Sequence, residues 1–535
     1  MFIGLSSKGV GKKFMSFFSN LRHHKIFLSY AAIQLIIYSP YITKLNLQND
    51  DFNYYVPEKT FLDIHPQFQF LVLLGRPITA IIIGIQNLFI YDITALNVVR
   101  IASITLISLI GKMLYDWLRI NKFGNLAYIS ALLVILLPGF SFMVNLTIAS
   151  AFILPILICL YIVKKEWTKD FPQTQLMKLP DFRLNYFLLF ICSLCIYQPT
   201  TMFFVPLIMI PLLISAPVDL PKHIQKTLIV GFNFSIASFF YFILFKLLLV
   251  FYLEERWAEA ANTLYSINNG MYRLDLNFNL LSKVAEFSGE TIPNGLNLWN
   301  IYGTRAYLYI SVFLVICALF KVGLINVWKL KEYFAGKLLI TFGCLVASNL
   351  PNIIASGGYI ANRTLLSFQV TMVFFICLLC VFLLRNAPPF LWRTIGSFLL
   401  LLVLGVLGIA FANSYTTATN NEIQVKYTRH ALENMPQGIV DFKPADTSKS
   451  HLNLKSINDE FNFNSSAYSL LIHIASTEPR LGETIGPFKF NYSGEKLDTR
   501  SIIDLNKIDE FHQESSFESI LKRILKYVVG GSNRH

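Results

Sequence analysis

The chain has 535 residues and a mean hydropathy of +0.52; 54% of its residues are hydrophobic and only 14% are charged. Soluble domains carry about 25% charged residues, so this composition excludes an ordinary soluble protein and a disordered one. The net charge is +13, and its meaning depends on where the charges lie along the chain.

The first 93 residues are predicted to contain one membrane span and one stretch that lies outside the bilayer. Residues 1–25 carry five Lys and Arg side chains and no acid, which indicates a cytoplasmic N-terminus. The first span is predicted over 26–42. In the segment that follows, 43–93, Gly75, Arg76 and Pro77 interrupt an apolar run, so two short interfacial pieces on the outer surface are expected rather than a second span.

Ten further apolar runs of membrane-spanning character follow, and they set the predicted fold. Their ranges are 94–111, 126–144, 146–163, 186–197, 202–214, 228–253, 306–320, 338–355, 365–384 and 394–411. The runs on either side of Tyr197 are short, which leaves open a break at Pro199 or an extension past Pro206. The sequence therefore predicts a polytopic α-helical membrane protein with about 11 transmembrane helices, its N-terminus inside and its C-terminus outside.

Charge supports this arrangement independently of hydropathy. The predicted cytoplasmic pieces hold 21 Lys and Arg residues against 6 Asp and Glu, whereas the external loops hold 8 against 11. Such an imbalance is typical of membrane topology and does not indicate a nucleic-acid partner. Counting 68–91 as a span would reverse the sidedness of every later loop.

Three external pieces are predicted: the loop 43–93, the loop 254–305 and a tail over 412–535. A bacterial inner membrane with these pieces on the periplasmic face is the natural interpretation. The domain organisation is thus a cytoplasmic N-terminus (1–25), a transmembrane domain (26–411) and a C-terminal domain (412–535). Turn residues and short apolar stretches in the tail favour a small mixed α/β C-terminal periplasmic domain.

Cysteine and metal motifs carry no functional signal in this sequence. All seven cysteines lie in apolar runs, so no disulfide framework is implied, and packing is the expected role of both CxxC pairs. No nucleotide-binding or zinc-binding signature is present. We therefore predict no metal site and no required cofactor.

Asp50 and Asp51 form an acidic pair just after the first span. Mutual repulsion near a membrane is expected to raise the pKa of one of them, which suits it to accept a proton. A solvated turn with side-chain hydrogen bonds is the competing interpretation.

Arginines on the predicted outer face are few, and Arg76, Arg305 and Arg363 are candidates to bind phosphate. A guanidinium matches a phosphate with bidentate geometry and can meet the charge of a phosphate leaving group. For Arg76 and Arg363 the competing interpretation is an interfacial arginine that extends toward the headgroups.

Two short motifs carry groups suited to a sugar. Tyr197 and Gln198 precede Pro199 in a predicted external turn, and Glu255 and Trp257 open the second external loop. Hydrogen-bonding groups beside aromatic rings can line a sugar site, although a helix-end turn and an interfacial belt explain both motifs equally well.

Taken in order, four motifs resemble those of a known family: Asn49-Asp50-Asp51, Gly75-Arg76, Tyr197-Gln198-Pro199 and Asn362-Arg363. The pattern resembles the serotype-converting O-antigen glucosyltransferases of the Glucosyltransferase II family, within the multi-span GT-C superfamily. The resemblance covers most of the membrane part and does not extend to the tail.

This resemblance implies transfer of glucose from polyprenyl (undecaprenyl) phosphate glucose to a sugar of the lipid-linked O-antigen on the periplasmic side. Asp50 or Asp51 would be the base of an inverting reaction, and Arg363, Arg76 or Arg305 would hold the departing lipid phosphate. Some relatives use a divalent metal, for which Asp50 and Asp51 could be ligands.

Other functions remain open on the sequence. The nearest is a GT-C transferase with another sugar or a lipid A acceptor. A flippase or transporter of lipid-linked sugar is a different class, but such proteins usually show internal repeats and charges near the midplane. An O-antigen polymerase would also act on lipid-linked sugars, but through arginine-rich external loops.

Overall fold

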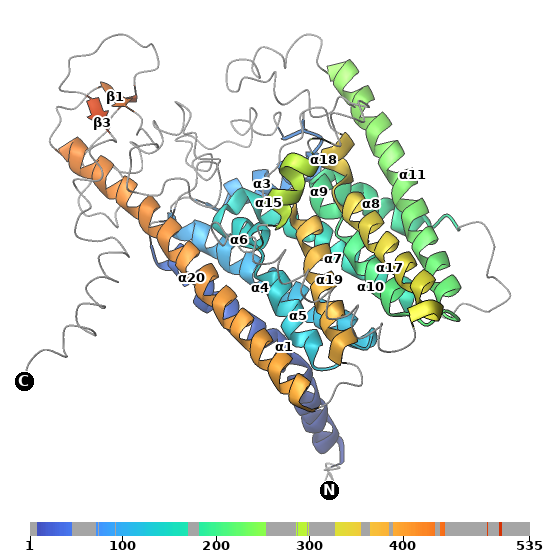
Figure 1. Cartoon of the computed structure of the whole chain (residues 1–535). Coiled ribbons are helices and arrows are strands. Elements are labelled where there is room, and N and C mark those ends of the chain that lie inside the picture. The colour runs from blue at the N-terminus through green and yellow to red at the C-terminus, as the bar shows by residue number, and fades with distance from the viewer. Residues whose placement is uncertain are drawn as a thin grey trace, which may run out of the picture.

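The computed structural model describes a helical membrane domain and three short strands (Figure 1). The described residues are 8–44, 46, 71–72, 74–90, 93–169, 181–252, 285, 287–296, 298, 327–354, 364–384, 389–433, 439–443, 489–490 and 502–504.

The first half of the domain contains eleven described helical elements. They are α1 (Lys8–Thr43), α3 (Pro77–Asn87), α4 (Ile93–Ile120), α5 (Leu126–Ile135), α6 (Pro138–Asn145), the 3-10 helix η2 (Thr147–Phe152), α7 (Ile153–Trp167), α8 (Leu184–Ile196), α9 (Gln198–Thr201), α10 (Phe204–Ile214) and α11 (Leu220–Tyr252).

The second half adds the remaining described elements. They are the π-helical turn η5 (Phe287–Thr291), α15 (Ile292–Leu296), α17 (Val327–Ser348), α18 (Leu350–Ile354), α19 (Leu366–Leu384) and α20 (Pro389–Glu433), followed by β1 (Ile439–Lys443), β2 (Lys489–Phe490) and β3 (Ile502–Asp504).

The protein is embedded in a membrane. Within the described residues, six helices are long and apolar enough to cross a bilayer: His24–Thr43, Ala95–Ile120, Thr147–Trp167, Leu220–Phe245, Leu366–Leu384 and Leu399–Glu433. The pair α5 and α6 would make a seventh if counted as one bent span, and four shorter apolar helices accompany them. The predicted span over 306–320 lies outside the described residues, and the number eleven stays a prediction.

Prolines and an extended residue interrupt the helical path at two places in the first half of the domain. The prediction of one helix over 126–144 was wrong, because α5 ends at Ile135 and Pro138 opens α6 at an angle of 52°. Proline lacks an N–H and disturbs the preceding turn, so it favours the first turn of a new helix. A second break falls at Tyr197, whose extended backbone (φ −160°, ψ 110°) separates α8 from α9, with Pro199 in the first turn of α9.

The last membrane helix is longer than expected. A boundary was predicted between residues 411 and 412, but α20 continues without interruption to Glu433. This extension packs on α1, where the Ser414 hydroxyl donates to the Ile37 carbonyl and Lys44 Nζ lies 3.3 Å from Glu422 Oε2. The helical domain therefore includes residues that the prediction assigned to the tail.

The helices form a bundle with two distinct ends (Figure 1). The short helices α3, α9, α15 and α18 lie together at one end, and α20 ends on the same side, where β1 and β3 lie. The N-terminus of the described chain lies at the opposite end. We call the first end the α9 end, and it contains the predicted outer-face motifs that the structure describes.

The described strands form a small parallel sheet in the order β2-β1-β3. Ile439 pairs with Lys489, and Phe442 pairs with Ile503. These strands fall within the segment for which the sequence predicts an α/β domain; the remainder of that segment past Glu433 lies outside the described residues.

Candidate functional site

Gly75 is the centre of a hydrogen-bonded cluster at the α9 end. Its φ of +77° lies in the left-handed region that favours glycine. The Gly75 carbonyl accepts hydrogen bonds from Tyr241 Oη at 2.9 Å and from Gln198 Nε2 at 3.2 Å. Gln198 Nε2 also donates to Tyr241 Oη at 2.5 Å. The turn before α3 is thus fastened to the start of α9 and to α11.

Arg76 follows Gly75 and lies against aromatic rings. Its guanidinium carbon is 4.6 Å from the centroid of the Tyr197 ring and 5.6 Å from that of Phe152. The two rings stack on each other with centroids 3.9 Å apart and an interplanar angle of 8°. A cation over an aromatic face is stabilised electrostatically, more strongly where water is excluded. Arg76 is half-buried, so the positive charge is held near the protein surface.

Tyr197 is fully buried, and its backbone is well held. Its carbonyl accepts from the hydroxyls of Thr200 at 3.2 Å and Thr201 at 3.0 Å. Its own hydroxyl has no hydrogen-bond partner among the described residues. A buried hydroxyl without a partner carries a free-energy cost, and a bound ligand or water is one way in which that cost is met.

Neighbouring helices fix the break that contains Tyr197. The Thr79 hydroxyl of α3 donates to the Ile196 carbonyl at 2.8 Å, and the Ser367 hydroxyl of α19 donates to the Pro199 carbonyl at 3.1 Å. Side chains of other elements therefore hydrogen-bond two of the carbonyls at the break. We call the group of Gly75, Arg76, Tyr197, Gln198 and Tyr241 the α9 site.

Two motifs that sequence analysis singled out are brought together in the α9 site. Gly75-Arg76 and Tyr197-Gln198 are about 120 residues apart in the chain, yet they share direct contacts. Asp50, Asp51, Glu255, Trp257, Arg305 and Arg363 lie outside the described residues. Their predicted roles stay predictions.

Sequence reasoning missed Tyr241, which belongs to the α9 site, and Phe152, whose ring contacts Tyr197 and Arg76. Tyr241 lies inside an apolar span, and Phe152 lies in an apolar run, so neither stands out in a hydropathy profile. Each is identified only by its distance to residues of other helices.

The chemistry available at the α9 site is that of binding. It offers a guanidinium, an amide and two phenol groups, which suit a phosphate and hydroxyl groups. In the described part of the chain, no three or more His, Cys, Asp and Glu side chains are grouped to hold a metal ion.

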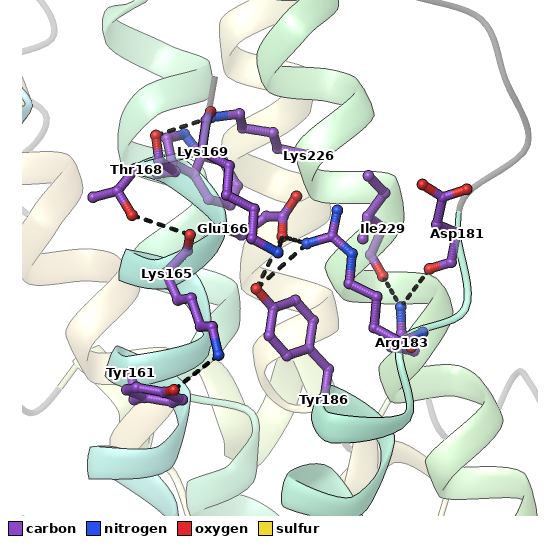
Figure 2. Close-up of polar contacts among 12 residues, drawn as sticks. Tyr161, Lys165, Glu166, Thr168, Lys169, Asp181, Arg183, Tyr186, Lys226 and Ile229 are labelled. Atoms are coloured by element: carbon purple, nitrogen blue, oxygen red, sulfur yellow. Dashed lines mark hydrogen bonds and ion pairs between the residues drawn. The ribbon is translucent and has the colours of Figure 1, made fainter. Parts of the chain in front are cut away.

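A second polar cluster lies where α7 ends and α8 begins, at the other end of these helices (Figure 2). The fully buried Glu166 forms an ion pair with Arg183, lies 3.7 Å from Lys169 Nζ, and accepts from Tyr186 Oη at 3.0 Å. Lys226 of α11 donates to the carbonyls of Trp167 and Lys169 at 2.9 and 2.8 Å, respectively.

This second cluster is best explained as a structural network of ion pairs and hydrogen bonds that joins α7, α8 and α11. Lys169, just after α7, and Arg183, just before α8, both pair with Glu166 (Figure 2). Lys226 connects α11 to the same region through the Trp167 and Lys169 carbonyls. A buried carboxylate requires such partners to remain charged. Each cluster contains a buried polar atom without a hydrogen-bond partner among the described residues, Tyr197 Oη in the first and Glu166 Oε1 in the second. The α9 site is the better candidate for ligand binding because it brings together two of the predicted motifs.

Comparisons of this chain with protein-family models, curated proteins and solved structures found no match.

Proposed function

We propose that this protein is a membrane-embedded glycosyltransferase that moves glucose from polyprenyl (undecaprenyl) phosphate glucose to a sugar hydroxyl of lipid-linked O-antigen, and so modifies lipopolysaccharide. The observation that supports this proposal is the convergence of Gly75-Arg76 and Tyr197-Gln198 in one cluster of direct contacts. Both pairs belong to the motif series that resembles the Glucosyltransferase II family.

In the proposed reaction the acceptor hydroxyl oxygen attacks the anomeric carbon of the donor glucose. Asp50 or Asp51 takes the hydroxyl proton as the new carbon–oxygen bond forms. The bond from the anomeric carbon to the phosphate oxygen breaks, its electron pair stays with the lipid phosphate, and the configuration is inverted.

Arg76 is proposed to meet the growing charge on that phosphate, with Arg305 and Arg363 as further candidates. Its contact with Tyr197 and Phe152 supports this role, because the two rings orient the guanidinium. Tyr197 and Gln198 are proposed to contact sugar hydroxyls, together with Glu255 and Trp257. A phosphate held by arginine does not demand a metal, although a divalent ion at Asp50 and Asp51 is compatible with the proposal.

The proposal also includes the finer topology: eleven spans in a bacterial inner membrane, a cytoplasmic N-terminus, and a periplasmic face that bears the α9 site and an α/β tail. The gathering of α3, α9, α15, α18 and the end of α20 on one side of the bundle supports this arrangement (Figure 1).

The test is transfer of radiolabelled glucose by the purified protein in lipid nanodiscs. Wild type is expected to label lipid-linked O-antigen, and Asp50→Asn or Asp51→Asn is expected to abolish labelling. Arg76→Lys keeps the charge but loses the bidentate geometry, so it should lower the rate by about 10-fold or more. Asp219→Asn and Arg119→Ala change exposed residues outside the site and serve as matched controls.

Three results would overturn the proposal. Transfer that survives loss of both acids removes the assigned base. Donor lipid that moves between vesicle leaflets without transfer identifies a flippase. A ladder of extended O-antigen chains without glucose addition identifies a polymerase.

A further inference from the structure

Arg100 is a fully buried arginine inside a membrane-spanning helix, α4. Charged side chains inside membrane spans are costly and are usually functional. Its guanidinium donates to the Tyr41 carbonyl at 3.1 Å, to Asn97 Oδ1 at 3.1 Å, and to the Asn46 carbonyl at 2.6 Å. Two of these three acceptors are backbone carbonyls at the end of α1.

Asn46 links this arginine to two more helices. Its Nδ2 donates to Asn145 Oδ1 of α6 at 2.7 Å, and its Oδ1 accepts from Asn421 Nδ2 of α20 at 2.7 Å. Asn97 Nδ2 adds a bond to the Ile42 carbonyl at 2.9 Å. All these groups except Ile42 are buried, so the end of α1 is tied by side chains to α4, α6 and α20.

This arrangement exceeds what helix packing requires. The last carbonyls of a helix need partners, and a cation there complements the helix dipole, but solvent or a surface lysine commonly suffices. Here one buried guanidinium and three buried amides hold Tyr41, Ile42 and Asn46 at the end of α1. Such a hydrogen-bond network fixes the position of the end of α1 relative to the other helices, in addition to stabilising the fold.

The fixed segment lies directly before the acidic pair in the chain. Asp50 is four residues after Asn46. A fully extended residue spans at most about 3.6 Å, so the Cα atom of Asp50 lies within about 14 Å of the Cα atom of Asn46. The clamp therefore limits where the acids can be.

We infer that Arg100, Asn46, Asn145 and Asn421 form a positioning clamp that fixes Asn46, the described residue four positions before the acidic pair in the chain. Arg100 acts through the carbonyls of Tyr41 and Asn46. The part of α20 beyond the predicted span contributes to the clamp through Asn421. The catalytic consequence rests on the proposed function, whereas the geometric role does not.

The test uses the full chain in nanodiscs, with Asn421→Ala, Arg100→Lys and Arg100→Ala. Asn421→Ala removes one neutral hydrogen bond and is the variant least disruptive to folding. Misplacing a reacting group by about 1 Å costs up to about 100-fold. We expect Asn421→Ala to lower kcat for glucose transfer by about 10- to 100-fold with little change in the KM for the donor lipid. Arg100→Lys should retain more activity than Arg100→Ala.

A second readout needs no enzyme activity. The variant Asn49→Cys is alkylated with a membrane-impermeant maleimide, and the parent chain provides the background from the native cysteines. Asn421→Ala is expected to change that alkylation rate at least about twofold, whereas Asn121→Ala, which removes a comparable amide bond to the Trp117 carbonyl, is expected to leave it unchanged.

The outcomes separate this inference from the proposed function. A changed alkylation rate in a protein without transferase activity supports the clamp and rejects the proposed function. Unchanged alkylation in folded Asn421→Ala and Arg100→Lys rejects the clamp, whatever the transferase assay shows. Changed alkylation with unchanged kcat in an active enzyme rejects the catalytic consequence.

Discussion

Replacement of Gly75 by alanine tests whether the α9 site is built as described. Gly75 has φ +77°, and a Cβ on it would overlap the Tyr241 hydroxyl oxygen and lie 3.2 Å from Gln198 Nε2. The left-handed backbone costs a residue with a Cβ about 1–2 kcal/mol. Displacing Tyr241 adds about 1 kcal/mol for its lost hydrogen bond to the Gly75 carbonyl. We expect Gly75→Ala to destabilise the protein by about 2–3 kcal/mol.

The second variant, Tyr241→Phe, removes the hydroxyl that the new Cβ would meet. It should cost about 1–3 kcal/mol on its own, because the Gly75 carbonyl and Gln198 Nε2 both lose a partner. In the Phe background, Gly75→Ala should cost mainly the backbone term, because the contacts that remain, Gln198 Nε2 at 3.2 Å and the ring Cζ at 3.3 Å, are tight but do not overlap the new Cβ. The double variant is therefore expected to be more stable than additivity predicts, by about 1 kcal/mol.

The assay is unfolding of the purified protein in mixed micelles by increasing SDS, followed by far-ultraviolet circular dichroism. Gly231→Ala is the matched control, because Gly231 lies in α11 and a Cβ there would meet nothing within 4 Å. Alanine favours a helix over glycine, so this control should gain about 0.5–1 kcal/mol. A Gly75→Ala variant that behaves like Gly231→Ala, or strict additivity with Tyr241→Phe, would refute the reasoning.

Three further predictions follow from other parts of the molecule. Tyr197→Phe should raise SDS stability by about 1 kcal/mol, because it removes a buried hydroxyl that has no partner among the described residues, and should reduce transfer if that hydroxyl binds a ligand; a loss of stability would indicate a structural partner. Glu166→Ala should lower the free energy of unfolding in the same SDS assay by about 2 kcal/mol, a value below that of a fully buried ion pair because Arg183 is partly exposed. Adding Arg183→Met should restore part of that loss, and additive losses would exclude a direct Glu166–Arg183 interaction between the helices. An alkaline phosphatase reporter fused after His535 should be active in a bacterial host if the tail is periplasmic, whereas activity of a cytoplasmic reporter at the same place would reverse the proposed topology.

Sequence alone identified the class of protein and much of its helix pattern. Hydropathy is a local property, so the run predicted over 365–384 is closely matched by α19, Leu366–Leu384. Local chemistry likewise gave the interruption before α3, because Gly75 has a positive φ and Pro77 begins that helix. The break near Pro199 was left open by the sequence, and it falls at Tyr197.

Only the tertiary structure decided which residues meet. Tyr241 reaches Gly75 across 166 positions of the chain, and Asn421 reaches Asn46 across 375. An apolar span does not reveal which of its polar groups faces a neighbour, and the register between helices depends on the packing of the whole bundle. For the same reason hydropathy ended the last span at residue 411, whereas α20 continues to Glu433. The polar residues of this extension are buried because they pack against the α1 region, which the hydropathy of α20 alone does not reveal. Composition and periodicity determine that this chain forms helices in a membrane, whereas long-range packing determines the site they build.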